Sequence, residues 1–146
     1  MDDRAIQYFL EGLKLAQNEL YIDAIHKFNM LVEEFPESDL ADDALYNVGL
    51  CYFKMNQFEM AIETFQQDIY NYPDATISAL DIGDAVGMTA AKCYYSIVLC
   101  HLALGKIELA IKATAQLDQF SENTYVLADN QNKTYAELAD HALKAN

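Results

Sequence analysis

The chain has 146 residues, of which 23 are acidic and nine are basic, so its formal net charge is −14. A surface of this sign repels phosphate backbones, which argues against nucleic-acid binding. It either favours a basic or amphipathic protein partner or simply keeps the chain in solution. An apolar content of 53%, with only two prolines and five glycines, argues against disorder and predicts one helical domain.

Two features of the sequence bear on where the protein resides. No run approaches the ~18 unbroken apolar residues of a membrane span, and MDDRAIQYFLEG lacks the pattern of an export signal. The three cysteines, Cys51, Cys93 and Cys100, have neither C-x-x-C spacing nor histidines at ligand spacing. We therefore expect three free, buried thiols and a cytoplasmic protein, or a periplasmic one if a leader has been removed.

Hydrophobic residues recur at helical spacing through most of the chain. The run NQNK at 130–133 favours a break before the last helix. The predicted class is all-α, with helices at about 4–17, 21–34, 40–54, 58–71, 89–104, 107–119 and 132–144.

The stretch from Leu45 to Pro73 has the pattern of two antiparallel helices. The apolar stripes are Leu45, Val48 and Tyr52 on the first helix and Ile62, Phe65 and Ile69 on the second. Gly49 and Ala61 are small where the two backbones approach, so a larger side chain there should cost about 1–3 kcal/mol. Pro73 ends the second helix.

The same landmarks recur elsewhere in the chain. A shift of 37 residues toward the N-terminus finds Gly12, Ala24, Phe28 and Pro36. A shift of 49 residues toward the C-terminus finds Gly105, Ala110 and Ile111, with Val98, His101, Thr114 and Glu122 in place of Gly, Tyr, Phe and Pro. The sequence therefore predicts three repeats, at about 5–37, 42–74 and 91–122.

The order and spacing of these residues resemble the tetratricopeptide repeat (TPR) family. The resemblance implies a single domain over 1–146, an α-α superhelix of three helix pairs capped by the helix at 132–144. The run PESDLADDALYNVGLCYFKMNQFEMAIETFQ looks most like bacterial cell-envelope repeat proteins of the Tol-Pal-associated and outer-membrane-assembly kind. Size and charge are also similar to those of type III secretion chaperones.

Twelve extra residues separate the second and third repeats, giving an insert at about 76–88. Ser78-x2-Asp81 is a capping pattern, and Ile82, Ala85 and Val86 follow it at one-face spacing. We expect a short extra helix or extra turns on the third repeat's first helix. Such an insert is either part of a binding face or a tolerated loop.

In the family, the concave surface is lined by the first helix of each pair. The resemblance implies a partner-binding groove made by Phe9, Leu13, Ala16, Gln17, Asp43, Tyr46, Asn47, Leu50, Phe53, Lys54, Lys92, Tyr95, Leu99 and Leu102. Members that hold the C-terminal carboxylate of heat-shock chaperones use a clamp of Lys, Asn and Arg. Asn47 and Lys92 match two of its five positions, whereas Phe9, Leu13 and Ser96 replace the other three. A groove of this composition suits an apolar peptide or an amphipathic helix.

Two alternatives remain open, because so wide an apolar patch should not stay bare. The terminal helix or the insert covers the groove, or a second copy buries it in a homodimer or larger assembly. His26, His101 and His141 lack ligand spacing, and no nucleotide-binding or nucleophile motif is present. Asp81 and Asp84 lack the other oxygen ligands of a calcium loop. We expect a non-catalytic interaction scaffold without a cofactor or metal.

Overall fold

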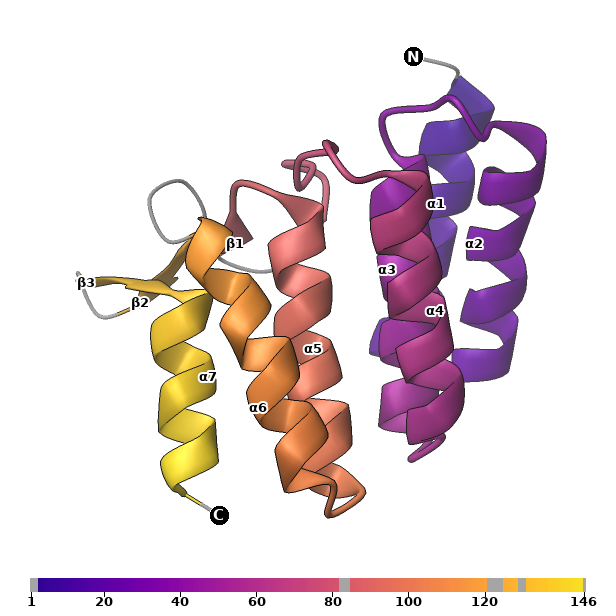
Figure 1. Ribbon diagram of the computed structural model, residues 1–146. Helices are drawn as coiled ribbons and strands as arrows, with labels where there is room; N and C mark the ends of the chain where they lie inside the picture. Colours follow the sequence, from indigo (N-terminus) through magenta and orange to yellow (C-terminus); the bar gives the residue numbers. More distant parts are fainter. Residues whose placement is uncertain (1–2, 82–84, 121–124, 129–130, 146) are drawn as a thin grey trace.

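The computed structural model describes residues 3–81, 85–120, 125–128 and 131–145, and its helices pack as consecutive antiparallel pairs (Figure 1). The pairs are α1 with α2, α3 with α4 and α5 with α6, and α7 packs against α5 and α6. The α-helices of the described residues are α1 Asp3–Gln17, α2 Tyr21–Glu34, α3 Ala41–Lys54, α4 Phe58–Asn71, α5 Thr89–Ala103, α6 Ile107–Ala115 and α7 Tyr135–Lys144. The prediction of an all-α superhelix is confirmed.

The C-terminal part differs from the sequence prediction in two details. The sixth helix changes after Ala115 into a 3₁₀ helix, η1 Gln116–Phe120. Three short strands, which were not predicted from the sequence, form an antiparallel sheet in the order β1-β2-β3: β1 Ala85–Val86, β2 Tyr125–Ala128 and β3 Gln131–Thr134.

The last helix begins at Tyr135. The Thr134 side chain caps this helix, because it accepts a hydrogen bond from the Glu137 N–H at 3.1 Å.

The turn inside each pair has the same backbone geometry in all three repeats. Glu19, Asn56 and Gly105 have φ angles of 61°, 61° and 74°, in the left-handed region. The next amide then reaches back to the last turn of the helix, with bonds of 2.9 Å from Leu20 to Leu15, 2.9 Å from Gln57 to Tyr52 and 2.8 Å from Lys106 to His101. The three predicted repeats therefore turn in the same way.

The two glycines of the repeat pattern have matching surroundings. A Cβ built on Gly12 would lie 2.6 Å from Phe28 Cε1, and one on Gly49 would lie 2.5 Å from Phe65 Cε1. The close approach predicted for Gly49 is therefore confirmed, and the group that needs the space is the phenylalanine ring of the partner helix.

The core is divided into three hydrophobic clusters along the array. The first lies among α1, α2 and α3, the second among α3, α4 and α5, and the third among α5, α6 and α7. Cys51, Cys93 and Cys100 are free and buried in it, as the sequence predicted.

The insert forms no helix in its described residues, so that prediction is wrong there. Ser78 does start a turn, in which its carbonyl accepts the Asp81 N–H at 3.1 Å. The Ser78 N–H donates to Asp43 Oδ1 at 3.0 Å and the Ile77 N–H to the Gly87 carbonyl at 2.8 Å. These bonds hold the segment extended against its neighbours, as does an isolated bridge between Thr76 and Met88. Ile82, Gly83 and Asp84 lie outside the described residues.

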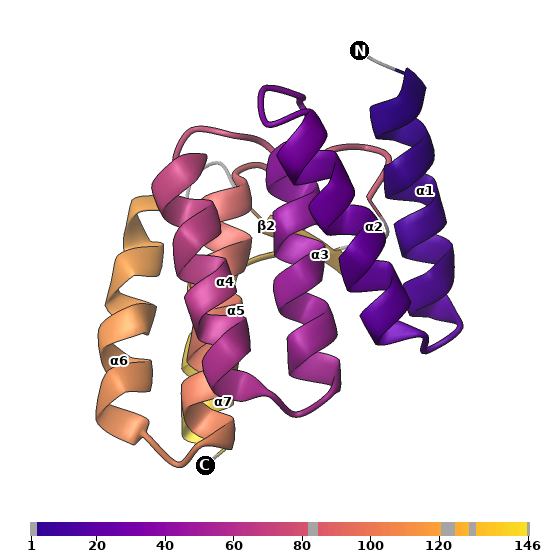
Figure 2. The ribbon, with the colours of Figure 1, turned by 90° about the vertical axis from the view of Figure 1, so that its right-hand side faces the viewer.

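We call residues 75–81 the strap. Figure 2 shows the segment that leaves α4 passing the end of α3 in the direction of α1. The link between the first two pairs is much shorter, with six residues from Phe35 to Leu40.

Candidate partner-binding groove

The inner faces of α1 and α3 enclose a hollow of about 360 Å³. Its lining is Leu13, Ala16, Gln17, Tyr21, Asn47, Leu50, Cys51, Lys54 and Asp81. The residues from α1 and α3 recur three and four positions apart, which places them on one face of each helix. Aliphatic side chains make up much of the lining, the polar side chains of Gln17 and Lys54 are exposed, and those of Asn47 and Asp81 are buried.

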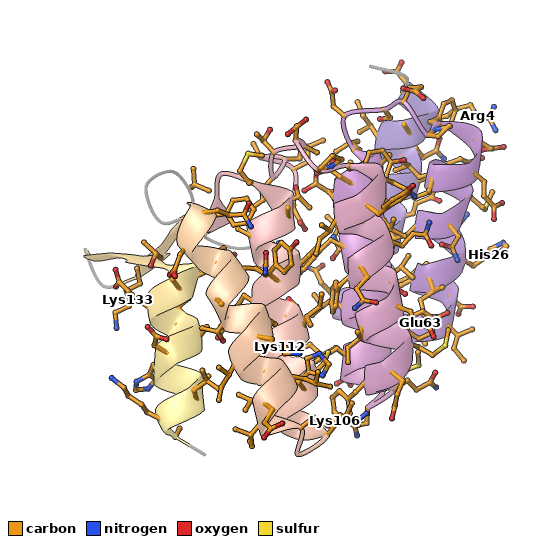
Figure 3. The ribbon with its side chains drawn as sticks, in the orientation of Figure 1. Arg4, His26, Glu63, Lys106, Lys112 and Lys133 are labelled. Carbon is orange, nitrogen blue, oxygen red and sulfur yellow. The ribbon has the colours of Figure 1, made fainter. Side chains whose placement is uncertain are left out.

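The structure brings six of the predicted groove residues together in this hollow: Leu13, Ala16, Gln17, Asn47, Leu50 and Lys54. Leu50 is partly exposed and Lys54 is exposed, so both are accessible at the surface. The second helices of the pairs expose polar side chains, among them His26, Glu63 and Lys112 (Figure 3), and also apolar ones such as Met60 and Ile111.

Phe9, Tyr46 and Phe53 do not line the hollow, which corrects the sequence-based site. Phe9 is fully buried and packs edge-on to Phe28 with ring centroids 5.9 Å apart. Tyr46 is 6% exposed and packs against Phe65 at 5.3 Å. The first helix of each pair contacts both its own partner and the next pair, so residues at the edge of the inner face fall into the core.

Phe53 lies near the C-terminal end of α3. Its ring packs edge-on to that of Phe58 at the start of α4, with ring centroids 5.3 Å apart. It contributes to the turn between these helices rather than to the groove. On α5, Leu99 remains partly exposed.

Lys92 and Asn47 hold a carboxylate of the chain itself. The Asn47 Nδ2 donates to Asp81 Oδ1 at 3.2 Å, and Lys92 Nζ pairs with Asp81 Oδ2 at 3.2 Å. Lys92 Nζ also lies 4.2 Å from the centroid of the Tyr46 ring. The two side chains that match the family's clamp positions are therefore occupied by the strap.

Tyr95, the predicted groove residue in the middle of α5, is covered by the terminal helix. Its ring lies 5.3 Å from that of Tyr135, which is 5% exposed. The open groove is consequently shorter than the sequence predicted, since α7 covers part of α5 and the strap covers the junction of α3 with α5.

Three aspartates, from α3 and α4, are buried near the junction of these helices with α5. Asp42 is hydrogen bonded to the Thr89 hydroxyl, Asp43 accepts the Ser78 N–H, and Asp68 Oδ2 accepts the Cys93 thiol at 3.3 Å. Asp43 Oδ2 and Asp68 Oδ1 are buried with no hydrogen-bond partner among the described residues.

Burial raises the pKa of the Asp68 carboxyl to about 8. The pKa of Asp43 is raised as well, first by burial and then by the adjacent carboxylate of Asp42. Neutral carboxyl groups are much less costly than ionised ones in such surroundings, so Asp43 and Asp68 hold their protons near neutral pH.

Asp43 was predicted to line the groove, and the burial of Asp42 and Asp68 was not predicted from the sequence. Comparison of the repeats could have indicated that Asp42 and Asp68 are buried. Asp42 occupies the position of Ala5 in the first repeat, and Asp68 that of Leu31, and both of those residues are fully buried.

The described residues do not support a metal site or a membrane-spanning helix. These contain no group of three or more His, Cys, Asp or Glu side chains placed to bind a metal. His101 is partly buried and its Nδ1 has no hydrogen-bond partner within the described part of the chain. Burial lowers the pKa of His101, as expected for a packed, neutral imidazole. No helix in the described ranges combines the length and apolar character that a membrane crossing needs.

Comparison with known sequences agrees with the repeat pattern. The tetratricopeptide repeat family model matches residues 42–67. A chloroplastic protein from Arabidopsis thaliana is 32% identical over 57 residues, a match that covers 39% of this chain. The same match spans only 17% of that relative's length.

Solved structures share the fold over nearly the whole chain. The Hsp90 co-chaperone Cns1 from Saccharomyces cerevisiae has a TM-score of 0.68 at 16% identity, covering 99% of this chain and 40% of that one. PcrH from Pseudomonas aeruginosa has a TM-score of 0.71 at 15% identity, covering 99% of this chain and 92% of that one. PcrH in complex with the chaperone binding region of PopD scores 0.71 at 16% identity with the same coverage.

The chain thus contains a TPR motif and has the fold of TPR proteins. These similarities lend no support to the predicted kinship with Tol-Pal-associated or outer-membrane-assembly proteins.

Proposed function

We propose that the chain is a non-catalytic scaffold that binds an apolar or amphipathic helical segment of another protein in the hollow between α1 and α3. The observation that carries this proposal is the aliphatic floor of Leu13, Ala16 and Leu50 in a hollow of about 360 Å³. Concave, mainly apolar sites with a few polar groups at the rim are the usual places for ligands.

The shape and chemistry of the hollow favour a helix. An amphipathic helix presents apolar side chains three and four residues apart, which matches the spacing of the residues on the two facing helices. The exposed side chains of Gln17 and Lys54 then hydrogen bond with polar atoms of the partner. The net charge of −14 favours a partner with basic residues on its other face.

A chaperone-like role, in which the chain holds an apolar segment of a client, is a second candidate. The fold likeness to PcrH, which was solved with the chaperone binding region of PopD, supports it. The TPR fold is typical of binding modules, and the apolar hollow between α1 and α3 is compatible with this role.

The proposal is tested by screening synthetic amphipathic peptides on an array and measuring the strongest binder by fluorescence anisotropy. The Leu50→Asp variant places a charge in the floor and should weaken binding by at least about tenfold, since it buries a charge against an apolar ligand. The control is Met60→Asp, because Met60 is 42% exposed on α4 and does not line the hollow.

Circular dichroism checks that both variants keep their helices. Equal affinity of the parent, Leu50→Asp and Met60→Asp for the peptide would contradict the assignment of the groove. Light scattering is measured in parallel: a parent dimer that Leu50→Asp converts to a monomer would show that a second copy occupies the groove.

A further inference from the structure

The strap is fixed at its first residues by backbone bonds with residues 87–89, and two further polar attachments hold it against α3 and α5. Near its centre the Ser78 N–H donates to Asp43 Oδ1, and at its end the Asp81 carboxylate binds Asn47 and Lys92. The Asp81 side chain is only 4% exposed, although it is charged and belongs to a surface loop. The strap therefore inserts a carboxylate into the inner surface formed by α3 and α5.

Few apolar contacts hold the strap. Ala79 and Leu80, the residues between its two points of attachment, are exposed, and Leu80 is 41% exposed. A segment with little buried apolar surface opens at a lower free-energy cost than the helices around it. The Ser78–Asp43 bond and the bonds of Asp81 are therefore principal restraints on residues 78–81.

The strap is longer than a connection between helix pairs requires. Six residues, 35–40, join α2 to α3, whereas residues 72–88 join α4 to α5 across an equivalent junction. The additional length is what allows Asp81 to reach the hollow, where it lies beside Asn47 and Leu50.

We propose that the strap is an intramolecular lid, which closes the α5 end of the groove in the free protein and is displaced when a partner segment enters. This inference rests on the proposed function, because the groove it regulates is the one assigned above. Displacement uncovers Asn47, Lys92 and the adjacent surface of α3, and so lengthens the groove from the open hollow toward α5. The affinity of the parent is then reduced by the fraction of molecules in which the strap is closed.

The test uses Asp81→Ala with Asp74→Ala as a matched control. Asp74 lies in the same connection, is exposed and is absent from the lining of the hollow, so its removal makes the same change of charge without touching the attachment. If Asp81→Ala loses helicity by circular dichroism, Asp81→Asn replaces it, because the amide keeps the shape and removes the ion pair with Lys92.

Two measurements on the free protein test the lid without any partner. Amide hydrogen exchange at Ser78 should be faster in Asp81→Ala by a factor on the order of ten, since its bond to Asp43 opens more often. Anilinonaphthalene sulfonate, a dye that binds exposed apolar surface, should fluoresce more strongly with Asp81→Ala than with the parent or Asp74→Ala. Equal exchange and equal fluorescence in all three proteins would overturn the lid, whatever the peptide screen finds.

The array peptide then tests displacement. Its affinity should rise in Asp81→Ala by a factor on the order of ten and stay unchanged in Asp74→Ala. Its addition to the parent should speed exchange at Ser78. Tight binding with slower exchange at Ser78, or weaker binding to Asp81→Ala, would refute the lid and leave the groove assignment intact. If no peptide on the array binds the parent or Asp81→Ala, the proposed function is refuted. The dye and exchange measurements do not depend on a peptide, so they would still decide whether the strap is a lid.

Discussion

Gly49 lies against the ring of Phe65 at the closest approach of α3 and α4, and Gly12 lies against Phe28 in the same way. The third repeat keeps the separation of the two positions but changes both side chains, to Val98 and Thr114. A larger residue on the first helix thus accompanies a smaller one on the second. Because the two side-chain volumes compensate for each other, α5 and α6 still pack as a pair although the third repeat departs from the pattern.

We predict that Gly49→Ala lowers the free energy of unfolding by about 2 kcal/mol, because Phe65 is fully buried and has no room to move away. Urea denaturation monitored by circular dichroism measures it. The comparison is Gly105→Ala, which meets no atom within 4 Å and reports only the strain of a positive φ. A Gly49→Ala variant as stable as the parent would contradict this packing.

Glu19 is a residue that the structure holds in an unfavourable backbone conformation. Its φ of 61° is one that glycine adopts freely and glutamate does not, and Gly105 occupies the same position in the third repeat. We expect Glu19→Gly to stabilise the protein by about 0.5–1 kcal/mol, as thermal unfolding can show. A lower melting temperature for Glu19→Gly would show that the side chain of Glu19 matters more than its backbone.

At the scale of the elements, α3, α4 and α5 meet around the buried carboxyl groups of Asp42, Asp43 and Asp68. The other charged groups facing this region are Asp81 from the strap and Lys92 from α5. One ammonium group therefore faces several carboxyls, and protonation keeps the junction from holding excess negative charge.

This arrangement predicts that stability falls as the pH rises. The pKa of Asp68 is about 8 in the folded protein, above its ordinary value of about 4, so the folded state binds the proton more tightly. The stabilisation is complete below about pH 4 and is lost progressively as the pH rises to about 8.

Urea denaturation at several pH values across that range checks the prediction for Asp68. The Asp68→Asn variant should show a shallower decline than the parent, and Asp74→Asn, at an exposed position, should match the parent. Stability that increased with pH, or an identical slope in Asp68→Asn, would contradict the assignment of a buried neutral carboxyl.

Particular residues show why helices were easier to predict than the site. The ends of α2 and α4 follow from local spacing, and Gly12, Ala24 and Phe28 recur in the next repeat, so the helices and repeats were predictable. The places of Phe9, Tyr46 and Asp81 depend on contacts between distant elements. The spacing of apolar residues shows that Tyr46 lies on the inward face of α3. It does not show whether the Tyr46 side chain lines the groove or packs against the next helix pair.

For the whole molecule, α7 closes the array at the C-terminal end. Tyr135 and Ala139 are buried against the third pair, so the terminal helix supplies the apolar contacts that a fourth repeat would otherwise make. Repeats of this kind depend on their neighbours for stability.

We expect Tyr135→Ala to lower the free energy of unfolding by about 3–4 kcal/mol and to expose Tyr95, as urea denaturation can measure. Tyr70→Ala is the control, because Tyr70 is 84% exposed and its loss should change stability by less than about 0.5 kcal/mol. Equal effects of the two substitutions would mean that α7 does not cap the array.

The central claim is that a partner binds the inner face between α1 and α3. Methyl NMR spectra of the protein with the array peptide test it most directly, because they report contacts at single side chains. The account predicts the largest shift changes at Leu13 and Leu50, and none at the exposed Ile22 of α2 and Ile111 of α6. Shift changes confined to Ile22 or Ile111, with Leu13 and Leu50 unaffected, would contradict it.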